Sequence, residues 1–123
     1  MRLTVHHLTQ LPERHRAHAE LILQDHILPA GQAFLLATFN DRAVALAWRQ
    51  DEHIGFFAVR DITRRRGVGS ELLHQLKADA RANGISRLEL NVAGLPAGDA
   101  TALTAFFTAC GFQQKGGVLS CSL

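Results

Sequence analysis

Six consecutive residues, Arg64 to Gly69, have the composition of a phosphate-binding loop. The run reads Arg-Arg-Arg-Gly-Val-Gly and lies where an extended apolar segment gives way to a helical pattern. The first amides of a helix have no internal acceptors and carry the positive end of the helix dipole, so they suit an anion. Gly67 and Gly69 leave room for a phosphate to reach those amides, and the arginines add fixed charge for its oxygens. We therefore predict a pyrophosphate site at this junction.

The elements that must position this loop follow from the hydrophobic periodicity of the chain. Their order predicts a mixed α/β (α+β) fold, with a central sheet of about six or seven strands flanked by about three helices. Antiparallel hairpins are expected in the first half, and a parallel strand pair around the helix that starts at Val68. Strands are expected over residues 2–8, 33–39, 43–49, 53–60 and 87–92, with one or two more around Gly116 and Gly117. Helices are expected from Pro12-Glu13 to near Pro29 with Leu21, Ile22 and Ile27 on the apolar face, from Val68 to Asn83-Gly84, and from an N-cap at Asp99 to Cys110.

Length and composition set further limits. A chain of 123 residues predicts one domain over residues 1–123. Cys110 and Cys121 lack metal or redox spacing, so we expect reduced thiols in a cytoplasmic protein. No segment approaches the roughly 20 apolar residues of a transmembrane helix, and we expect no membrane partner. A net charge of +2 and a basic run of only three residues do not predict nucleic-acid binding, which stays the weakest alternative.

The arginine–glycine loop and a second motif together resemble the Gcn5-related N-acetyltransferase (GNAT) family. The second motif, Ala105 to Phe112, is similar to the aromatic-x-x-x-Gly-Phe ending of that family's last helix. The resemblance implies the GNAT fold and acetyl-CoA as the ligand, with the pantetheine arm held by strand backbone and the diphosphate held by the loop. The implied binding residues are Phe57, Ala58, Val59, Thr63, Arg64, Arg65, Arg66, Gly67, Val68, Gly69 and Ser70.

A narrower resemblance is to the PanZ/PanM group, small acetyltransferase-like activators of the aspartate 1-decarboxylase proenzyme. That group binds acetyl-CoA and promotes self-cleavage of the proenzyme to its pyruvoyl form, which links β-alanine and pantothenate synthesis to the coenzyme A pool. The resemblance implies a hetero-oligomer with the proenzyme and a partner contact at Asn40. The chain departs from the group between residues 21 and 32 and again over 118–121. The matching segments are Val59 to Gly69, Thr104 to Phe106, Gly111-Phe112 with Gly116-Gly117, and the hairpin Phe39 to Arg42.

Groups that could catalyse acetyl transfer are sparse. The reaction needs a base for the amine proton and usually an acid for the leaving thiolate. In many GNAT relatives that acid is a tyrosine, but the matching position is Phe107 and the chain contains no tyrosine. We interpret Cys110 as a buried apolar residue, and Glu89 as a solvated strand carboxylate rather than a base, for which Asp51 to His53 are further candidates. We predict no catalytic residue, and an active GNAT N-acetyltransferase on a small amine or peptide is the alternative.

The histidines do not predict a metal site. His15 and His18 lie three residues apart on an expected helix, but no third ligand is near in sequence, and an exposed polar face is the simpler interpretation. His6 and His7 are neighbours on an expected strand, so their side chains point to opposite faces. We therefore expect no bound metal.

Overall fold

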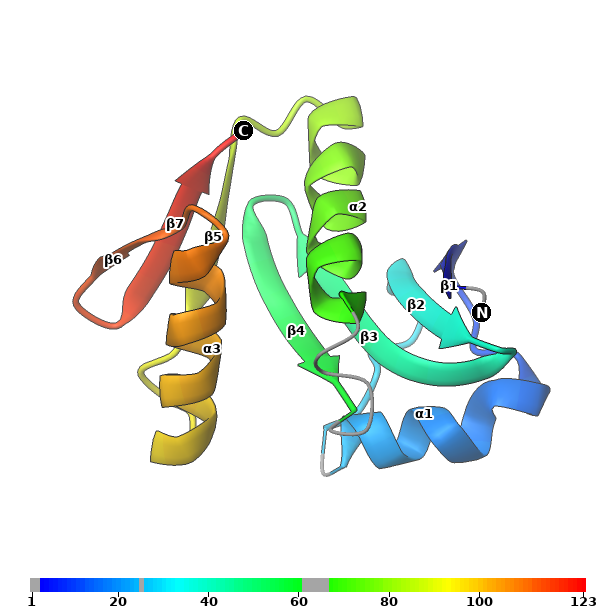
Figure 1. Ribbon diagram of the computed structural model, residues 1–123. Helices are drawn as coiled ribbons and strands as arrows, with labels where there is room; N and C mark the ends of the chain where they lie inside the picture. Colours follow the sequence, from blue (N-terminus) through cyan, green and yellow to red (C-terminus); the bar gives the residue numbers. More distant parts are fainter. Residues whose placement is uncertain (1–2, 25, 61–66) are drawn as a thin grey trace. The chain divides into compact units, whose positions relative to one another are not determined.

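The computed structural model describes residues 3–24, 26–60 and 67–123, and within them seven strands form a mixed sheet flanked by three helices (Figure 1). The strand order is β1-β2-β3-β4-β5-β7-β6. The strands are β1 (Leu3–Leu8), β2 (Phe34–Phe39), β3 (Arg42–Gln50), β4 (His53–Val59), β5 (Arg87–Asn91), β6 (Gln113–Lys115) and β7 (Val118–Ser122). The helices are α1 (Arg16–Leu23), which follows the 3-10 turn η1 (Glu13–His15), α2 (Val68–Ala82) and α3 (Ala97–Ala109).

The predicted fold class and strand directions are confirmed. β1 pairs with β2 and β2 with β3 in antiparallel fashion, whereas β4 and β5 are parallel, with His53 opposite Glu89. The helix between β4 and β5 is α2, and a parallel connection needs such a crossover. None of the helices in the described part of the chain has the length and apolar character needed to cross a bilayer.

The chain folds as two compact units. The first comprises Met1–Arg49 and Gly55–Leu76, and the second comprises Gln50–Ile54 and Lys77–Leu123. One boundary falls inside β4 and another inside α2, so each of these elements contributes residues to both units.

The core of the first unit gathers apolar side chains from α1 and from strands β2 to β4. The rings of Trp48 and Phe56 stack at its centre, with centroids 4.8 Å apart. Gly55 permits this arrangement, because a Cβ atom at residue 55 would lie 2.5 Å from Nε1 of the buried Trp48. α2 adds an apolar stripe at helical spacing, as the sequence predicts. Buried members of the core cluster are Ile22, Leu23, Phe34, Leu36, Ala43, Leu46, Trp48 and Phe56, and buried residues of the α2 stripe in this unit are Val68, Leu72, Leu73 and Leu76.

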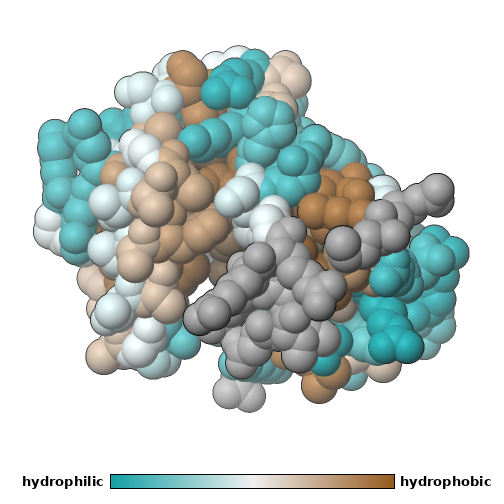
Figure 2. Space-filling view, viewed as in Figure 1, coloured by the Kyte–Doolittle hydropathy of each residue, from teal (hydrophilic) through white to brown (hydrophobic). Residues whose placement is uncertain are grey.

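The second unit packs α3 with the antiparallel strands β5, β7 and β6. Phe107 on α3 is fully buried, and its ring meets Phe112 edge-on with centroids 4.8 Å apart. The ammonium of Lys77 lies 5.3 Å from the Phe112 ring and donates to the Cys110 carbonyl at 3.4 Å, which secures the C-terminal end of α3. On the face shown in Figure 2, α3 is pale to brown, whereas the β6 region is teal.

Two helix boundaries differ from the sequence-based expectation. α1 ends at Leu23 rather than near Pro29, because Gln24 adopts a left-handed backbone with φ 53°. Ile27 is therefore outside the helix and is 85% exposed, and Leu21 is 58% exposed instead of facing the core. α3 begins at Ala97 after Pro96, so Asp99 lies within the first turn and is not the N-cap. Its carboxylate still complements the positive end of the helix dipole there.

Candidate functional site

The predicted phosphate loop lies between the end of β4 and the start of α2. β4 ends at Val59 and α2 begins at Val68, and both positions belong to the first unit (Figure 1). Of the predicted binding residues, Thr63 and Arg64 to Arg66 lie outside the described residues. Phe57, Ala58 and Val59 are the last three residues of β4. Gly67 directly precedes α2, and Val68, Gly69 and Ser70 are its first three residues.

Gly67 precedes α2 with a left-handed backbone. Its φ is +76°, which favours glycine, and a Cβ atom added there would meet none of the described residues within 4 Å. The amide of Glu71 donates to the Gly67 carbonyl at 3.0 Å, and this bond closes the first turn. The amides of Val68 to Ser70 come before that bond, so they are the donors that a helix leaves for an external acceptor. The fully buried Val68 side chain anchors this turn to the core.

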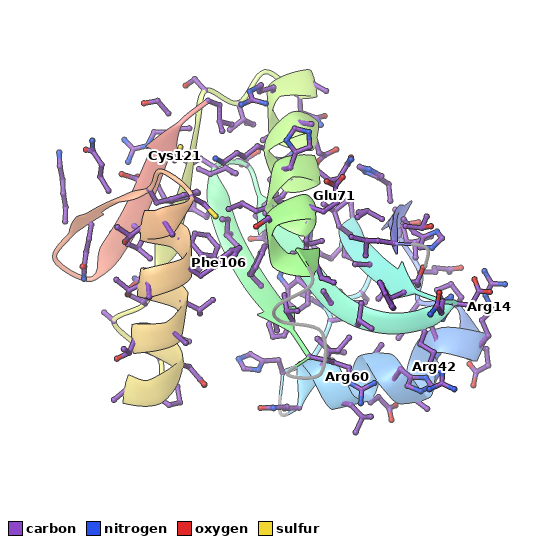
Figure 3. The ribbon with its side chains drawn as sticks, in the orientation of Figure 1. Arg14, Arg42, Arg60, Glu71, Phe106 and Cys121 are labelled. Atoms are coloured by element: carbon purple, nitrogen blue, oxygen red, sulfur yellow. The ribbon has the colours of Figure 1, made fainter. Side chains whose placement is uncertain are left out.

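The strand that precedes the loop is firmly held. Phe57 is buried, whereas Ala58 and Val59 are half-buried. Beyond them, the amide of Arg60 donates to the Val44 carbonyl of β3 at 2.8 Å, so the sheet ladder extends past the last strand residue. Figure 3 shows Arg60 at this end of β4. A strand end bonded to β3 and a helix start anchored by Val68 therefore flank residues 61–66 in the sequence.

Glu71 is the acidic side chain closest in sequence to the helix start (Figure 3). Gln75, one turn further along α2, donates to its carboxylate at 3.0 Å. This bond draws the carboxylate toward the second turn of the helix. The negative charge is thereby directed along the helix surface, where it interferes least with an anion at the helix end.

Asn40 lies at the tip of the β2–β3 hairpin and is exposed. Asn40 and Asp41 have φ values of 53° and 65°, the conformation of a two-residue type I′ turn, so the predicted hairpin connection is confirmed. The turn explains the choice of Asn and Asp at these two positions. Contact of Asn40 with a partner stays a prediction.

His15 corrects the sequence-based interpretation of an exposed polar face. Its side chain is only 4% exposed, and His18 is half-buried. The reason is local: η1 follows Pro12 as a tight 3-10 turn, and this turn directs His15 inward against β1, where its ring centroid lies 6.3 Å from that of His6. Burial lowers the pKa of His15, the charges of Arg14, His6 and His18 lower it further, and that of Asp41 opposes the shift.

The positions considered for acetyl-transfer chemistry fall into two groups. Phe107 is a core residue that carries no ionisable group, and Cys110 is partly exposed at the end of α3 rather than buried. Glu52, His53 and Glu89, by contrast, come together because the start of β4 lies beside β5. The interpretation of Glu89 as a solvated carboxylate is wrong, since its side chain is 21% exposed and ion-paired with Arg87 and His53.

Sequence reasoning could not find this grouping. Glu52 and Glu89 are far apart along the chain, and the strand pairing that joins them is set by the parallel register. The backbone amide of Glu89 donates to the Glu52 carbonyl at 2.7 Å, so the two side chains start from fixed neighbouring positions.

Comparisons with known proteins identify the family and match the fold described above. A sequence model of the family described as "Acetyltransferase (GNAT) domain, PanZ" matches residues 3–120. None of the curated proteins searched matches the chain. Among solved structures, YhhK from E. coli, determined in solution bound to coenzyme A, superposes with a TM-score of 0.81 at 26% identity and covers 100% of both chains.

Two further structures share the fold at lower identity. The ribosomal-protein-S18-alanine N-acetyltransferase from Escherichia coli is 21% identical with a TM-score of 0.70, and the match covers 98% of this chain and 94% of that one. A GNAT family acetyltransferase from Elizabethkingia anophelis with acetyl-CoA bound is 15% identical with a TM-score of 0.65, covering 98% of each chain.

Proposed function

Since the chain belongs to the PanZ family of GNAT acetyltransferase domains, we propose that it is an acetyl-CoA-binding regulator of the aspartate 1-decarboxylase proenzyme. In this role the coenzyme is a ligand that shapes a surface for the proenzyme, and the complex promotes cleavage of the proenzyme to its pyruvoyl form. The protein would thereby couple β-alanine and pantothenate synthesis to the supply of acetyl-CoA.

The start of α2 is the observation that supports acetyl-CoA binding most directly. Gly67 has φ +76° with no described residue within 4 Å of a Cβ position, and the amides of Val68 to Ser70 come before the Glu71–Gly67 helical hydrogen bond. A diphosphate fits this arrangement, because the amides supply donors and the missing side chain leaves room for its oxygens. We propose that the diphosphate is held by Thr63 to Ser70 and the pantetheine arm by the backbone of Phe57 to Val59. The coenzyme A bound to YhhK, which matches the whole chain, supports the same ligand.

The Gly67→Ala variant tests this site. A methyl group at residue 67 would occupy the space in which the diphosphate approaches the amides, so we expect acetyl-CoA binding to weaken on the order of tenfold or more in calorimetric titration. The matched control is Gly84→Ala at the other end of α2, where φ is +79° and a Cβ atom also meets nothing within 4 Å. Both variants should lose about 1 kcal/mol of stability from the same left-handed backbone.

Two results would contradict the proposed ligand site. One is equal acetyl-CoA affinity of the Gly67→Ala and Gly84→Ala proteins. The other is the absence of binding heat when acetyl-CoA is titrated into the unmodified protein.

The proposed partner is supported by the family and by the exposed hairpin tip at Asn40. We expect size-exclusion chromatography of the purified protein mixed with the proenzyme to give a complex when acetyl-CoA is present. Asn40→Gly should weaken that complex, because glycine keeps the left-handed turn while removing the amide side chain. Asp51→Gly is the control, since Asp51 occupies an exposed hairpin turn with φ 52°.

Two assays, of proenzyme maturation and of thiol release, distinguish the proposed regulatory role from N-acetyltransferase activity. Co-expression should accelerate cleavage of the proenzyme, whereas incubation with acetyl-CoA and amine acceptors should release no free thiol. Unchanged maturation together with no complex would overturn the regulatory role. Sustained thiol release with an amine would favour the N-acetyltransferase alternative.

A further inference from the structure

The side chains of Glu52, His53 and Glu89 converge at the start of β4 in the second unit. One potential ligand atom from each lies within 4.8 Å of the others. Nδ1 of His53 lies 3.4 Å from Oε2 of Glu89, and Nε2 lies 3.8 Å from Oε1 of Glu52. The imidazole therefore stands between two carboxylates, one from the turn that precedes β4 and one from β5.

Arg87 completes the group from the same face of β5. Its Nε lies 3.8 Å from Oε2 of Glu52, and its Nη2 contacts Oε1 of Glu89. Each carboxylate thus presents one oxygen to the guanidinium and the other to the imidazole. Arg87 orients both carboxylates while leaving their imidazole-facing oxygens available.

From this arrangement we propose that Glu52, His53 and Glu89 bind one divalent transition metal ion of the zinc type. Zinc is held by imidazole nitrogen and carboxylate oxygen at about 2.0–2.2 Å, which separates tetrahedral ligand atoms by about 3.4 Å. The distance from Nδ1 of His53 to Glu89 already equals this value, whereas Glu52 lies nearest the other ring nitrogen, so the ring or the Glu52 carboxylate must turn for one nitrogen to share an ion with both oxygens. One nitrogen of the ring would bind the metal, with Arg87 as the outer group that holds the carboxylates.

Backbone contacts hold two of the three ligands before any metal arrives. The amide of Glu89 donates to the Glu52 carbonyl at 2.7 Å, and His53 is opposite Glu89 in the parallel register. His53 and Glu89 project from paired strands, which hold ligand spacing better than a loop does, and Glu52 in the turn before β4 is tied to β5 by its carbonyl. The His53 ring, at 67% exposure, is free to turn toward the two oxygens.

Charge and donor type decide which ion the group favours. Two carboxylates and one guanidinium carry a net charge of −1, which attracts a single divalent cation. The nitrogen donor selects Zn²⁺, Co²⁺ or Ni²⁺ over Mg²⁺ and Ca²⁺, which prefer all-oxygen sites. The exposure of His53 and Glu52 leaves the remaining coordination positions open to water.

Titration of Co²⁺ into the chelator-treated full chain tests the proposal, with visible absorption as the signal. We expect saturation at one equivalent, displacement of Co²⁺ by Zn²⁺, and no displacement by excess Mg²⁺. His53→Gln and Glu89→Gln should each weaken binding at least about tenfold, as loss of a metal ligand does. The control is His74→Gln, the same change at an exposed histidine of α2, which should bind as the unmodified protein does.

Folding and ligand binding are checked on the same samples. Metal-free thermal unfolding should be similar for His53→Gln and His74→Gln, because both side chains are exposed. Equal Co²⁺ binding by these two variants, or no saturable binding by the unmodified chain, would overturn the metal site. Acetyl-CoA calorimetry before and after chelation reports on the proposed function separately, so either proposal can fail while the other stands.

Discussion

At the scale of single residues, His15 shows how a fold changes the chemistry of a side chain. His15 is only 4% exposed, so its charged imidazolium form would lose most of its solvation by water. Burial therefore keeps the pKa of His15 below the ordinary value of 6.5. Arg14 adds a like charge, and Asp41 at the hairpin tip opposes the effect. The neutral form of His15 is therefore the form that the native structure favours.

The shift of the His15 pKa predicts a pH dependence of stability. Because the pKa is lower in the folded protein than in the unfolded chain, its contribution is fully present above pH 6.5 and is lost as the pH falls through 6.5 toward the folded value. Denaturant unfolding of His15→Gln should show a flatter pH profile across this range than the unmodified protein. His7→Gln, a change at an exposed histidine of β1, should keep the original slope. Equal slopes for all three proteins would contradict the assignment.

At the scale of elements, α3 carries the family motif at its C-terminal end and contributes a buried aromatic side chain from within that motif. Phe107 lies where many GNAT relatives carry a tyrosine, yet it is fully buried and packs edge-on against Phe106 and Phe112. Figure 3 shows Phe106 on the same helix. The ring at position 107 supports the packing of the second unit, and as a phenyl group it has no proton to donate.

Phe107→Tyr tests this structural role. The added hydroxyl would enter a fully buried site beside two aromatic rings, so we expect a loss of about 1–3 kcal/mol in the free energy of unfolding. We also expect no release of free thiol from acetyl-CoA in the presence of amines. Chemical denaturation and a thiol assay measure the two effects. Gain of transferase activity in a protein of unchanged stability would contradict this account of α3.

At the scale of the whole molecule, the two units are joined by continuous elements. β4 and α2 each supply residues to both units, so neither unit can unfold without disrupting a strand or a helix of the other. This sharing supports the expectation of a single cooperative domain over residues 1–123.

The prediction is one coincident unfolding transition for both units. Trp48, the chain's single tryptophan, lies in the first unit and reports through fluorescence, whereas Cys110 and Cys121 both lie in the second and report through reaction with a thiol reagent. Equal denaturant midpoints for the two signals are expected of a two-state domain. Separate midpoints would show that the units unfold independently.

Local sequence patterns determined much of this protein. The element order, the Asn40-Asp41 hairpin and the left-handed end of α2 at Gly84 are confirmed. These features depend on side-chain period, turn chemistry and the special backbone of glycine, all of which act within a few residues. The binding roles of Phe57 to Val59 and of Thr63 to Ser70 stay predictions.

Contacts between distant segments decided the rest. The meeting of Glu52 with Glu89 depends on which strands pair and in what register. Periodicity says which side of a strand a residue occupies but not which strand becomes its neighbour or in what register. Only the tertiary structure, by pairing β4 with β5, brings an imidazole and two carboxylates within reach of one ion.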